Sequence, residues 1–388
     1  MNSKRSIYLN NAATGYPKPD NVLNAVHEYL RRVPSSARRS GVKDGEDILA
    51  ECRHKLAALF HAPEAEQMVF TAGGTESLNL AILGSTFKDS HIITTTTEHN
   101  SVLRPLKKLE ADGVIQLSIV ACNAAGEVTP LSVANALREN TRAVILNHCS
   151  NVTGRVLDLH PFAEIAHTHR ALFIVDASQS AGLTPIDVQA DGIDMLAFTG
   201  HKSLHGLPGI GGLFIRNGLW PTPLKFGGTG VKSQLLTFPP TMPLYYEAGT
   251  PNTVGIVSLS AGIDYILATG MEEIRKKKEY WVSQFYNELK DLPRVIFYGK
   301  AHSQVSSTVI CFNIEGLPTE DLGYILENSF HMIIRAGLHC APLIHAALGS
   351  FPQGSVRLSP SFFTTQAEIE QAIAAVRQIC LGAKVNHL

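Results

Sequence analysis

The fold is decided by the segment Ile193-Asp194-Met195-Leu196-Ala197-Phe198-Thr199-Gly200-His201-Lys202. In it an apolar run leads to a single lysine, and the glycine-rich segment 205–212 follows shortly after. This order predicts a buried strand that ends in tight turns, with Lys202 at the mouth of a sheet. Burial lowers the pKa of a lysine amine and makes it a nucleophile, whereas a lone lysine on a turn is the commoner arrangement. The residues around Lys202 decide between these two readings.

Length and composition predict a globular α/β protein with a small-molecule partner. The chain has 388 residues, of which 45% are hydrophobic and 31 are glycine, and its formal net charge is -1. This length indicates two domains. The numbers of acidic and basic residues are nearly equal, so the sequence lacks the excess of positive charge that is typical of proteins that bind nucleic acid or an anionic membrane.

The N-terminus and the cysteines indicate where the protein resides. Residues 1–5 lead directly into the strand-like Ile7-Tyr8-Leu9, without the apolar region of a signal peptide. Apolar runs stay well below the roughly 20 residues of a membrane span. The six cysteines include no CxxC pair, so we expect neither a metal site nor a disulfide framework. A cytoplasmic location is the prediction.

Helical and strand patterns alternate along the first two thirds of the chain. We expect helices over residues 46–60, 101–110, 131–138 and 161–168, and strands over residues 68–71, 91–94, 115–119, 143–146, 171–175 and 193–198. Such alternation predicts a largely parallel sheet that is covered by helices on both faces.

The last third of the chain has a different pattern. A long helical region is expected over residues 254–289, followed by a strand over 305–313, a helix over 319–328, a strand over 355–358 and a helix over 365–379. We therefore predict a large domain over residues 15–258 and a smaller α+β domain formed by residues 1–14 and 259–388.

Polar clusters follow the predicted strands of the large domain, each at the point where a strand ends. They are residues 71–76, 97–100, 147–151, 176–179 and 199–202. Because the carboxyl ends of parallel strands meet at one edge of an α/β sheet, these clusters are expected to line a single pocket.

Three of these clusters carry groups that suit pyridoxal phosphate. Gly73-Gly74-Thr75-Glu76 lies at a helix N-terminus, where free N–H groups bind phosphate, although Thr75 is also suited to cap the helix. A carboxylate such as Asp176 keeps a pyridinium nitrogen protonated, or it caps the turn after its strand. Gln179 is equally suited to donate to a ring oxygen or to a structural role. His99 combines a flat ring with a pKa near neutrality, which suits stacking and acid-base work.

In order along the chain, these motifs resemble those of the class V aminotransferase family and, within it, the cysteine desulfurases and selenocysteine lyases. The resemblance covers the chain from Asn10 to the last helix. It rests on Gly74-Thr75-Glu76, Glu98-His99, Asn151-Val152-x-Gly154, Asp176-x-x-Gln179, Thr199-x-His201-Lys202, Ala248-Gly249-Thr250-Pro251-Asn252 and Arg335-x-Gly337-x-His339-Cys340.

The resemblance implies fold type I of the pyridoxal-phosphate-dependent transferases, with a mostly parallel seven-stranded sheet. It implies that Lys202 holds the cofactor as a Schiff base, that Asp176 meets the ring nitrogen and that Gln179 meets the ring oxygen. His99 would stack on the ring, and Asn151 would lie beside the ring and the substrate amine. The phosphate would be held by Gly74, Thr75, Thr199, His201 and, from the other subunit of a homodimer, Thr250.

Two further residues concern the substrate. Arg357 matches the arginine that binds the substrate carboxylate, a task that suits its planar fork, with a surface ion pair as the alternative. Cys340 matches the thiol that takes the sulfur, and the cations Arg335 and His339 near it in sequence favour the thiolate. Cys149 is a rival thiol, which we expect to be a packing residue.

The reaction implied is cysteine desulfuration, in which L-cysteine becomes L-alanine and Cys340 receives the sulfur as a persulfide, with a sulfur-acceptor protein as a possible partner. Leu338 and Pro342 depart from the familiar desulfurase loop, and the compact loop is closer to that of the group that includes selenocysteine lyases. Selenocysteine lyase activity is therefore an alternative. So is a class V aminotransferase or C–S lyase that does not use Cys340, while a scaffold without enzymatic activity fits poorly with the set of acid-base groups.

Overall fold

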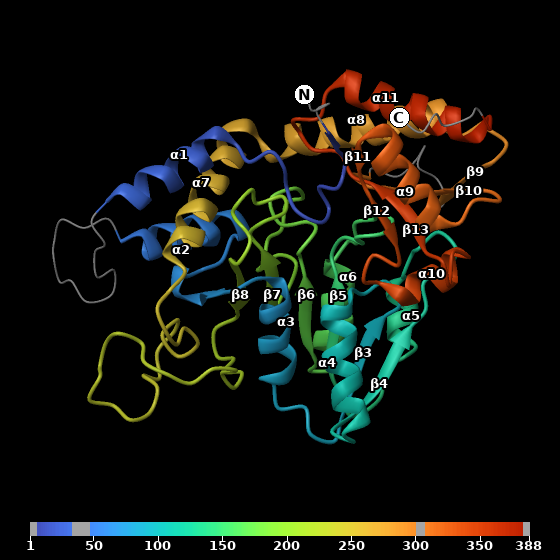
Figure 1. The fold of residues 1–388 in the computed structure, drawn as a ribbon. Helices are drawn as coiled ribbons and strands as arrows, with labels where there is room; N and C mark the ends of the chain where they lie inside the picture. Colours follow the sequence, from blue (N-terminus) through green and yellow to red (C-terminus); the bar gives the residue numbers. More distant parts are fainter. Residues whose placement is uncertain (1–5, 33–46, 300–306, 383–388) are drawn as a thin grey trace.

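A seven-stranded sheet forms the centre of the larger part of the molecule (Figure 1). The computed structural model describes residues 6–32, 47–299 and 307–382. The strands lie in the order β2 (Met68–Thr71), β8 (Gly211–Ile215), β7 (Met195–Thr199), β6 (Leu172–Asp176), β5 (Thr141–Asn147), β3 (Ser90–Thr95) and β4 (Ile115–Val120). Only β8 runs against its two neighbours. The predicted mostly parallel sheet of seven strands is therefore confirmed.

Strand β8 was not predicted from the sequence, because it begins with two glycines and the glycine-rich segment 205–212 is typical of turns. A Cβ on Gly212 would lie 2.4 Å from Cζ of Phe198, and one on Gly211 would lie 2.6 Å from Cα of Gly73. The strand therefore needs glycine to pair closely with β7 and to admit the turn at Gly73.

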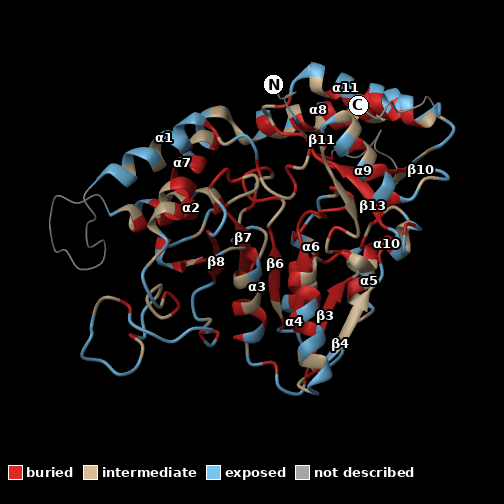
Figure 2. Ribbon diagram, in the orientation of Figure 1, coloured by how far each residue is buried: buried red, intermediate tan, exposed pale blue. Residues whose placement is uncertain are grey.

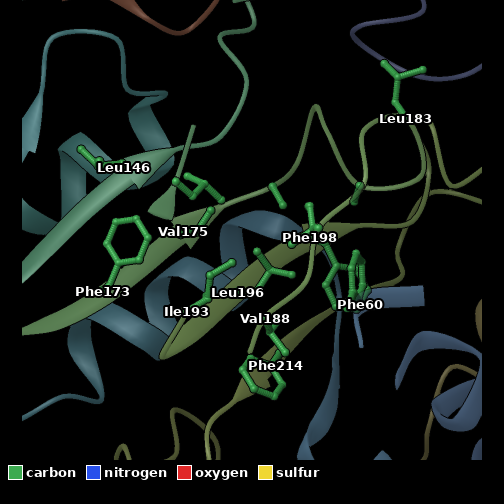
Figure 3. Close-up of a cluster of buried hydrophobic side chains, with 14 of the residues drawn as sticks. Phe60, Leu146, Phe173, Val175, Leu183, Val188, Ile193, Leu196, Phe198 and Phe214 are labelled. Atoms are coloured by element: carbon green, nitrogen blue, oxygen red, sulfur yellow. The ribbon is translucent and has the colours of Figure 1, made fainter. Parts of the chain in front are cut away.

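Helices cover both faces of the sheet, as predicted. One core cluster joins α2 (Ile48–Phe60), α6 (His160–Thr168) and α7 (Thr253–Thr269) to alternate strand residues such as Phe173 and Val175. Figure 3 shows part of this cluster, with Phe60, Phe198 and Phe214 close together. The opposite face packs α3 (Gly74–Leu83) and α4 (Asn100–Ala111) against Ile174 and its neighbours. Burial of both faces explains the continuous apolar runs of the strands (Figure 2).

The helical region expected over residues 254–289 is two helices, α7 and α8 (Met271–Leu289), which bend by 82° at their junction. Gly270 separates them with a φ of 90°, a conformation that glycine adopts without strain. No single described helix is long and apolar enough to cross a membrane. Among the described residues, only this bent pair, taken together, has the length and composition of a membrane span.

The last third of the chain forms a four-stranded antiparallel sheet in the order β12 (Arg335–Gly337), β13 (Ser355–Leu358), β10 (Ile310–Ile314) and β9 (Val295–Tyr298). Residues 305 and 306 of the strand expected over 305–313 lie outside the described residues. Strands β9 and β12 were not expected. The helices here are α9 (Thr319–Phe330), α10 (Pro342–Leu348) and α11 (Gln366–Cys380).

The N-terminal segment lies beside this second sheet. Strand β1 (Ile7–Tyr8) pairs in parallel with β11 (Met332–Ile333), and Ile7 and Leu9 share a core cluster with Phe285 on α8. The chain then crosses to the large sheet through α1 (Asp20–Arg31), and the short elements η1 (Ala65–Gln67) and α5 (Pro130–Ala134) complete the fold. The domain boundaries given above stay a prediction.

Candidate active site

A cavity of about 790 Å³ lies at the carboxyl ends of the strands, where the polar clusters were expected to meet. Asn147 is the last residue of β5 and Asp176 is the last residue of β6, and the two are paired neighbours in the sheet. The structure brings ten of the predicted site residues to this cavity, although their roles stay predictions. These are Gly74, Thr75, His99, Asn151, Asp176, Gln179, Thr199, His201, Lys202 and Arg357.

Lys202 lies on the turn after β7, as the sequence predicted, and it lines the cavity. Its amine has no hydrogen-bond partner among the described residues. Burial lowers the pKa of Lys202 to about 8, while the nearby Asp176 carboxylate opposes this change and the Arg357 guanidinium adds to it. A considerable fraction of the amine is therefore neutral near physiological pH, as a nucleophile requires.

Asp176 and Gln179, at the end of β6 and in the turn after it, line the same cavity as Lys202. Oδ1 of Asp176 accepts a hydrogen bond from the Ser178 backbone N–H at 2.8 Å, so the turn-capping role is present. Oδ2 has no partner among the described residues, which leaves it available to a ligand. Nε2 of Gln179 donates to the Ala12 carbonyl at 3.0 Å, and this leaves its second N–H free.

The N-terminus of α3, with Gly73, Gly74 and Thr75, forms a polar cradle at the edge of the cavity. The N-cap is Gly73, so the alternative in which Thr75 caps the helix is wrong, and the Thr75 hydroxyl instead lies 2.8 Å from Oγ of Ser101. A Cβ on Gly74 would lie 2.5 Å from Oγ of Ser178. The bare glycine backbone and hydroxyl groups at a ten-residue helix terminus suit an anionic group. Ser178 was missed by the sequence analysis, because a serine in a turn carries no distinctive pattern.

His99 is held in one orientation by the helix that it caps. Its Nδ1 accepts from the backbone N–H of Ser101 at 3.0 Å, which leaves Nε2 to carry the proton of the neutral ring. Burial lowers the pKa of His99 to about 4. In the cavity as it stands, His99 is therefore a neutral imidazole with a fixed tautomer.

Arg357 on β13 is 1% exposed, so the surface ion pair considered for it is wrong. Nη1 donates to the Asn151 carbonyl at 2.9 Å and Nη2 to Oδ1 of Asn10 at 3.4 Å, while Nε is buried without a partner. Burial lowers the pKa of Arg357 to about 10. Among the described residues no carboxylate pairs with it. A buried arginine without a counter-charge is suited to receive an anionic substrate group.

Cys340 follows His339, which lines the cavity, and its thiol contacts another lining residue. Nη2 of Arg335 donates to Sγ of Cys340 at 3.0 Å. Two hydrogen bonds from the start of α4 and from the turn after β5 hold the loop: the Asn100 N–H donates to the Cys340 carbonyl at 2.7 Å, and the Asn151 side chain donates to the His339 carbonyl at 2.7 Å. The thiol is thereby fixed beside the cavity.

Two further residues named from the sequence, Cys149 and Thr250, differ from these in position or environment. Cys149 lines the cavity but is buried, and burial raises the pKa of its thiol to about 12, which agrees with the packing role expected for it. Thr250 is exposed and lines a separate cavity of about 150 Å³. A single chain does not bring Thr250 to the phosphate cradle, so its contribution from a second subunit stays a prediction.

Glu98 is a buried acid that the sequence analysis quoted only as part of a motif. Its side chain is 0% exposed, Oε1 accepts from the Thr95 hydroxyl at 2.7 Å, and Oε2 has no partner. Burial raises the pKa of Glu98 to about 8. A protonated carboxyl therefore lies directly before His99, and no local pattern distinguishes it from a solvent-exposed glutamate.

Comparison with known proteins agrees with this geometry. The Aminotransferase class-V family model matches residues 7–372. A probable cysteine desulfurase of Methanothermobacter thermautotrophicus is 31% identical over 94% of this chain and 92% of its own, and a cysteine desulfurase of Shigella flexneri is 30% identical over 96% and 93%. The apo structure of a cysteine desulfurase from Thermococcus onnurineus superposes with a TM-score of 0.89 and 30% identity, covering 97% and 95%.

The structural match confirms the expected fold type I, because that neighbour covers both sheets of this chain. The family match likewise confirms the resemblance that the ordered motifs indicated. The chain belongs to the aminotransferase class-V family.

Proposed function

We propose that the protein is a pyridoxal-phosphate-dependent cysteine desulfurase, which converts L-cysteine to L-alanine and takes the sulfur onto Cys340 as a persulfide. The relatives named cysteine desulfurase support the activity. The observation that carries the assignment is the contact between Nη2 of Arg335 and Sγ of Cys340, at 3.0 Å, beside the cavity that Lys202 lines. A guanidinium that donates to a thiol sulfur stabilises the thiolate, the reactive form.

The cavity fits pyridoxal phosphate. A Cβ on Gly74 would collide with Oγ of Ser178, so the position needs glycine and its backbone stays open to a phosphate, while Asp176 keeps one carboxylate oxygen free for a pyridinium nitrogen. Lys202 would hold the aldehyde carbon and His99 would lie against the ring. When bound, this cofactor withdraws electrons from the substrate Cα and makes its C–H bond acidic.

The chain's own groups perform the remaining steps. Arg357 binds the substrate carboxylate in its planar fork and so orients the Cα–H bond. The Lys202 amine would accept the Cα proton, because it lines the cavity and has no other hydrogen-bond partner among the described residues. Because the pKa of Lys202 is lowered to about 8, this amine both accepts and returns a proton near neutral pH.

Sulfur transfer follows at Cys340. Its thiolate forms an S–S bond with the substrate sulfur, and the Cβ–S bond breaks with its electron pair remaining on Cβ. A proton delivered to that carbon completes the methyl group of alanine. The persulfide left on Cys340 requires a thiol acceptor, either a small reductant or a sulfur-carrier protein.

Selenocysteine is a second candidate substrate. Selenium is a better leaving group than sulfur, so its release depends less on attack by Cys340. The loop from Gly337 to Ala341 is short and is held by hydrogen bonds from Asn100 and Asn151. It therefore restricts how far the Cys340 thiol can move toward a substrate, which supports this candidate.

A homodimer is part of the proposal. The irregular segment 216–252 exposes several large apolar side chains, including Phe226 (74%) and Leu236 (102%). Such a patch on a protein surface favours coverage by a partner. A second copy that covers it would bring Thr250 to a neighbouring cradle. The cytoplasmic location also stays a proposal.

The test measures sulfide and alanine formed from L-cysteine in the presence of dithiothreitol. We expect equal amounts from the wild type, loss of both in Cys340→Ala, and unchanged amounts in the matched control Cys149→Ala. Sulfide production that survives in Cys340→Ala would overturn the persulfide step. Pyruvate and ammonia in place of alanine would identify a C–S lyase instead.

A further inference from the structure

The segment Asn10–Thr14 contacts three residues of the site in succession. Asn10 accepts from Arg357, the Ala12 carbonyl accepts from Gln179, and Oγ1 of Thr14 lies 3.1 Å from Nδ1 of His201. The segment is itself held from outside the cavity, because the Ala12 N–H donates to Oγ of Ser359 at 2.9 Å. The contact between Thr14 and His201 joins residues 187 positions apart.

The direction of the bond between Thr14 and His201 follows from the acceptors nearby. The Thr14 hydroxyl is within hydrogen-bonding distance of the His201 carbonyl, at 3.2 Å, but there it competes with two shorter bonds, from the Gly15 N–H at 2.8 Å and from Nζ of Lys18 at 3.0 Å. The two lone pairs of the carbonyl are occupied by these donors. The hydroxyl hydrogen of Thr14 is therefore free to point at Nδ1.

His201 is neutral in this environment. Burial lowers the pKa of His201 to about 4, and the charges of Lys202 and Lys18 act in the same direction. A neutral imidazole carries one proton, so a ring that accepts at Nδ1 carries its proton on Nε2. His201 lines the 790 Å³ cavity, whereas Thr14 and Lys18 line a second cavity.

We propose that Thr14 is a positioning residue: its hydroxyl donates to Nδ1 of His201 and thereby fixes Nε2–H as a hydrogen-bond donor to the cofactor phosphate. The proposal rests on the proposed pyridoxal-phosphate site. Without the hydroxyl, His201 is no longer held in this tautomer, and its Nε2 presents a lone pair to the phosphate for part of the time. The effect is confined to ligands that carry the phosphate.

The experiment titrates apoprotein with pyridoxal phosphate and, separately, with pyridoxal, which lacks the phosphate, and follows absorbance and intrinsic fluorescence. Thr14→Val replaces the hydroxyl by a methyl group of similar size. It is expected to weaken pyridoxal phosphate binding roughly 10- to 100-fold, the range for one hydrogen bond to a charged group, while pyridoxal binding stays unchanged. Thr14→Ser keeps the hydroxyl and is expected to restore the affinity.

A double-mutant cycle with His201→Ala completes the test, because Thr14→Val should add no further loss once the imidazole is gone. An equal loss for pyridoxal, a full effect of Thr14→Val in the His201→Ala background, or wild-type affinity in Thr14→Val would each overturn the proposal. A wild-type protein that prefers pyridoxal phosphate over pyridoxal, together with an unaffected Thr14→Val, overturns this inference alone. A wild type that binds neither ligand overturns the proposed function as well.

Discussion

Nη2 of Arg335 lies 3.0 Å from Sγ of Cys340, and the loop that carries the thiol is tied to the cofactor side of the cavity through Asn100 and Asn151. His339 and Cys340 both adopt positive φ, 51° and 59°, a conformation that side-chain-bearing residues rarely take. The loop is therefore held by its hydrogen bonds in a strained form, a state found at functional sites.

Removal of the Arg335 guanidinium is expected to make the Cys340 thiol less reactive. Arg335→Met keeps the side-chain length but removes the donor to sulfur, so alkylation of Cys340 by iodoacetamide at neutral pH should become slower. Arg377→Met, which removes an exposed partner of Glu288, is the matched control and should react as the wild type does. Unchanged alkylation of Arg335→Met would contradict the role of the guanidinium.

Replacement of Arg357 is expected to separate substrate binding from stability. Arg357→Met should raise the KM for L-cysteine at least 10-fold, because the carboxylate loses its paired donors. The free energy of unfolding should change little, because removal of a buried charge without a counter-ion offsets the loss of its hydrogen bonds to Asn10 and Asn151. Steady-state kinetics and urea unfolding measure the two effects. A variant with an unchanged KM would show that the carboxylate binds elsewhere.

Lys202→Ala is expected to lose the covalently held cofactor. The variant should bind pyridoxal phosphate without the visible absorbance of a lysine Schiff base, and gel filtration should remove the cofactor from it but not from the wild type. Lys108→Ala is the matched control, since the Lys108 amine pairs with Asp112 at an exposed position and does not line the main cavity. Visible absorbance that persists in Lys202→Ala without added amine would count against the assignment.

Glu98→Gln is expected to change how stability depends on pH. Burial raises the pKa of Glu98 from 4.5 to about 8, the hydrogen bond from the Thr95 hydroxyl opposes the rise, and the charge of Asp176 adds to it. Between about pH 4.5 and pH 8 the native state thus holds a proton that the unfolded state has released, and stability falls as pH rises through this window.

Glutamine mimics the protonated acid at every pH, so Glu98→Gln should gain stability relative to the wild type between pH 5 and pH 8, by a few kcal/mol at about 1.4 kcal/mol per pKa unit. Urea unfolding at several pH values measures the difference. Glu320→Gln, at an exposed position, is the control and should show no such trend. A pH-independent difference for Glu98→Gln would mean that the carboxyl is ionised in the native protein.

The buried pair of Arg53 and Glu247 is expected to anchor the irregular segment 216–252 to the sheet. Nη1 and Nη2 of Arg53 each donate to one carboxylate oxygen of Glu247 at 2.7 Å, and the Phe70 N–H donates to Oε1 of Glu247 at 2.8 Å. Glu247→Ala leaves the arginine buried and should cost about 3–5 kcal/mol of unfolding free energy. Asp112→Asn breaks an exposed pair with Lys108 and should cost at most about 1 kcal/mol. Equal losses would contradict the buried anchor.

The sequence by itself determined the alternation of strands and helices and the edge where the polar side chains gather. Apolar periodicity is local, so the strands that end at Asp176 and Thr199 and the placement of Lys202 followed from a few neighbouring residues. The glycine-rich strand β8 could not be predicted in this way. Its glycines are required by close contacts with Gly73 and Phe198, which are not sequence neighbours of the strand.

Only the tertiary structure decided which polar atoms meet. It left the Nε of Arg357 without a partner among the described residues and placed the Thr14 hydroxyl next to the His201 ring, whereas Arg335 was already expected near Cys340 from its place five residues before it. Hydrogen bonds act over about 3 Å, and the residues that make them are joined by packing of the N-terminal segment and two sheets rather than by sequence spacing. The sequence therefore determined which groups are present at the site, and the packing decided which nitrogen, oxygen or sulfur of each group is available for chemistry.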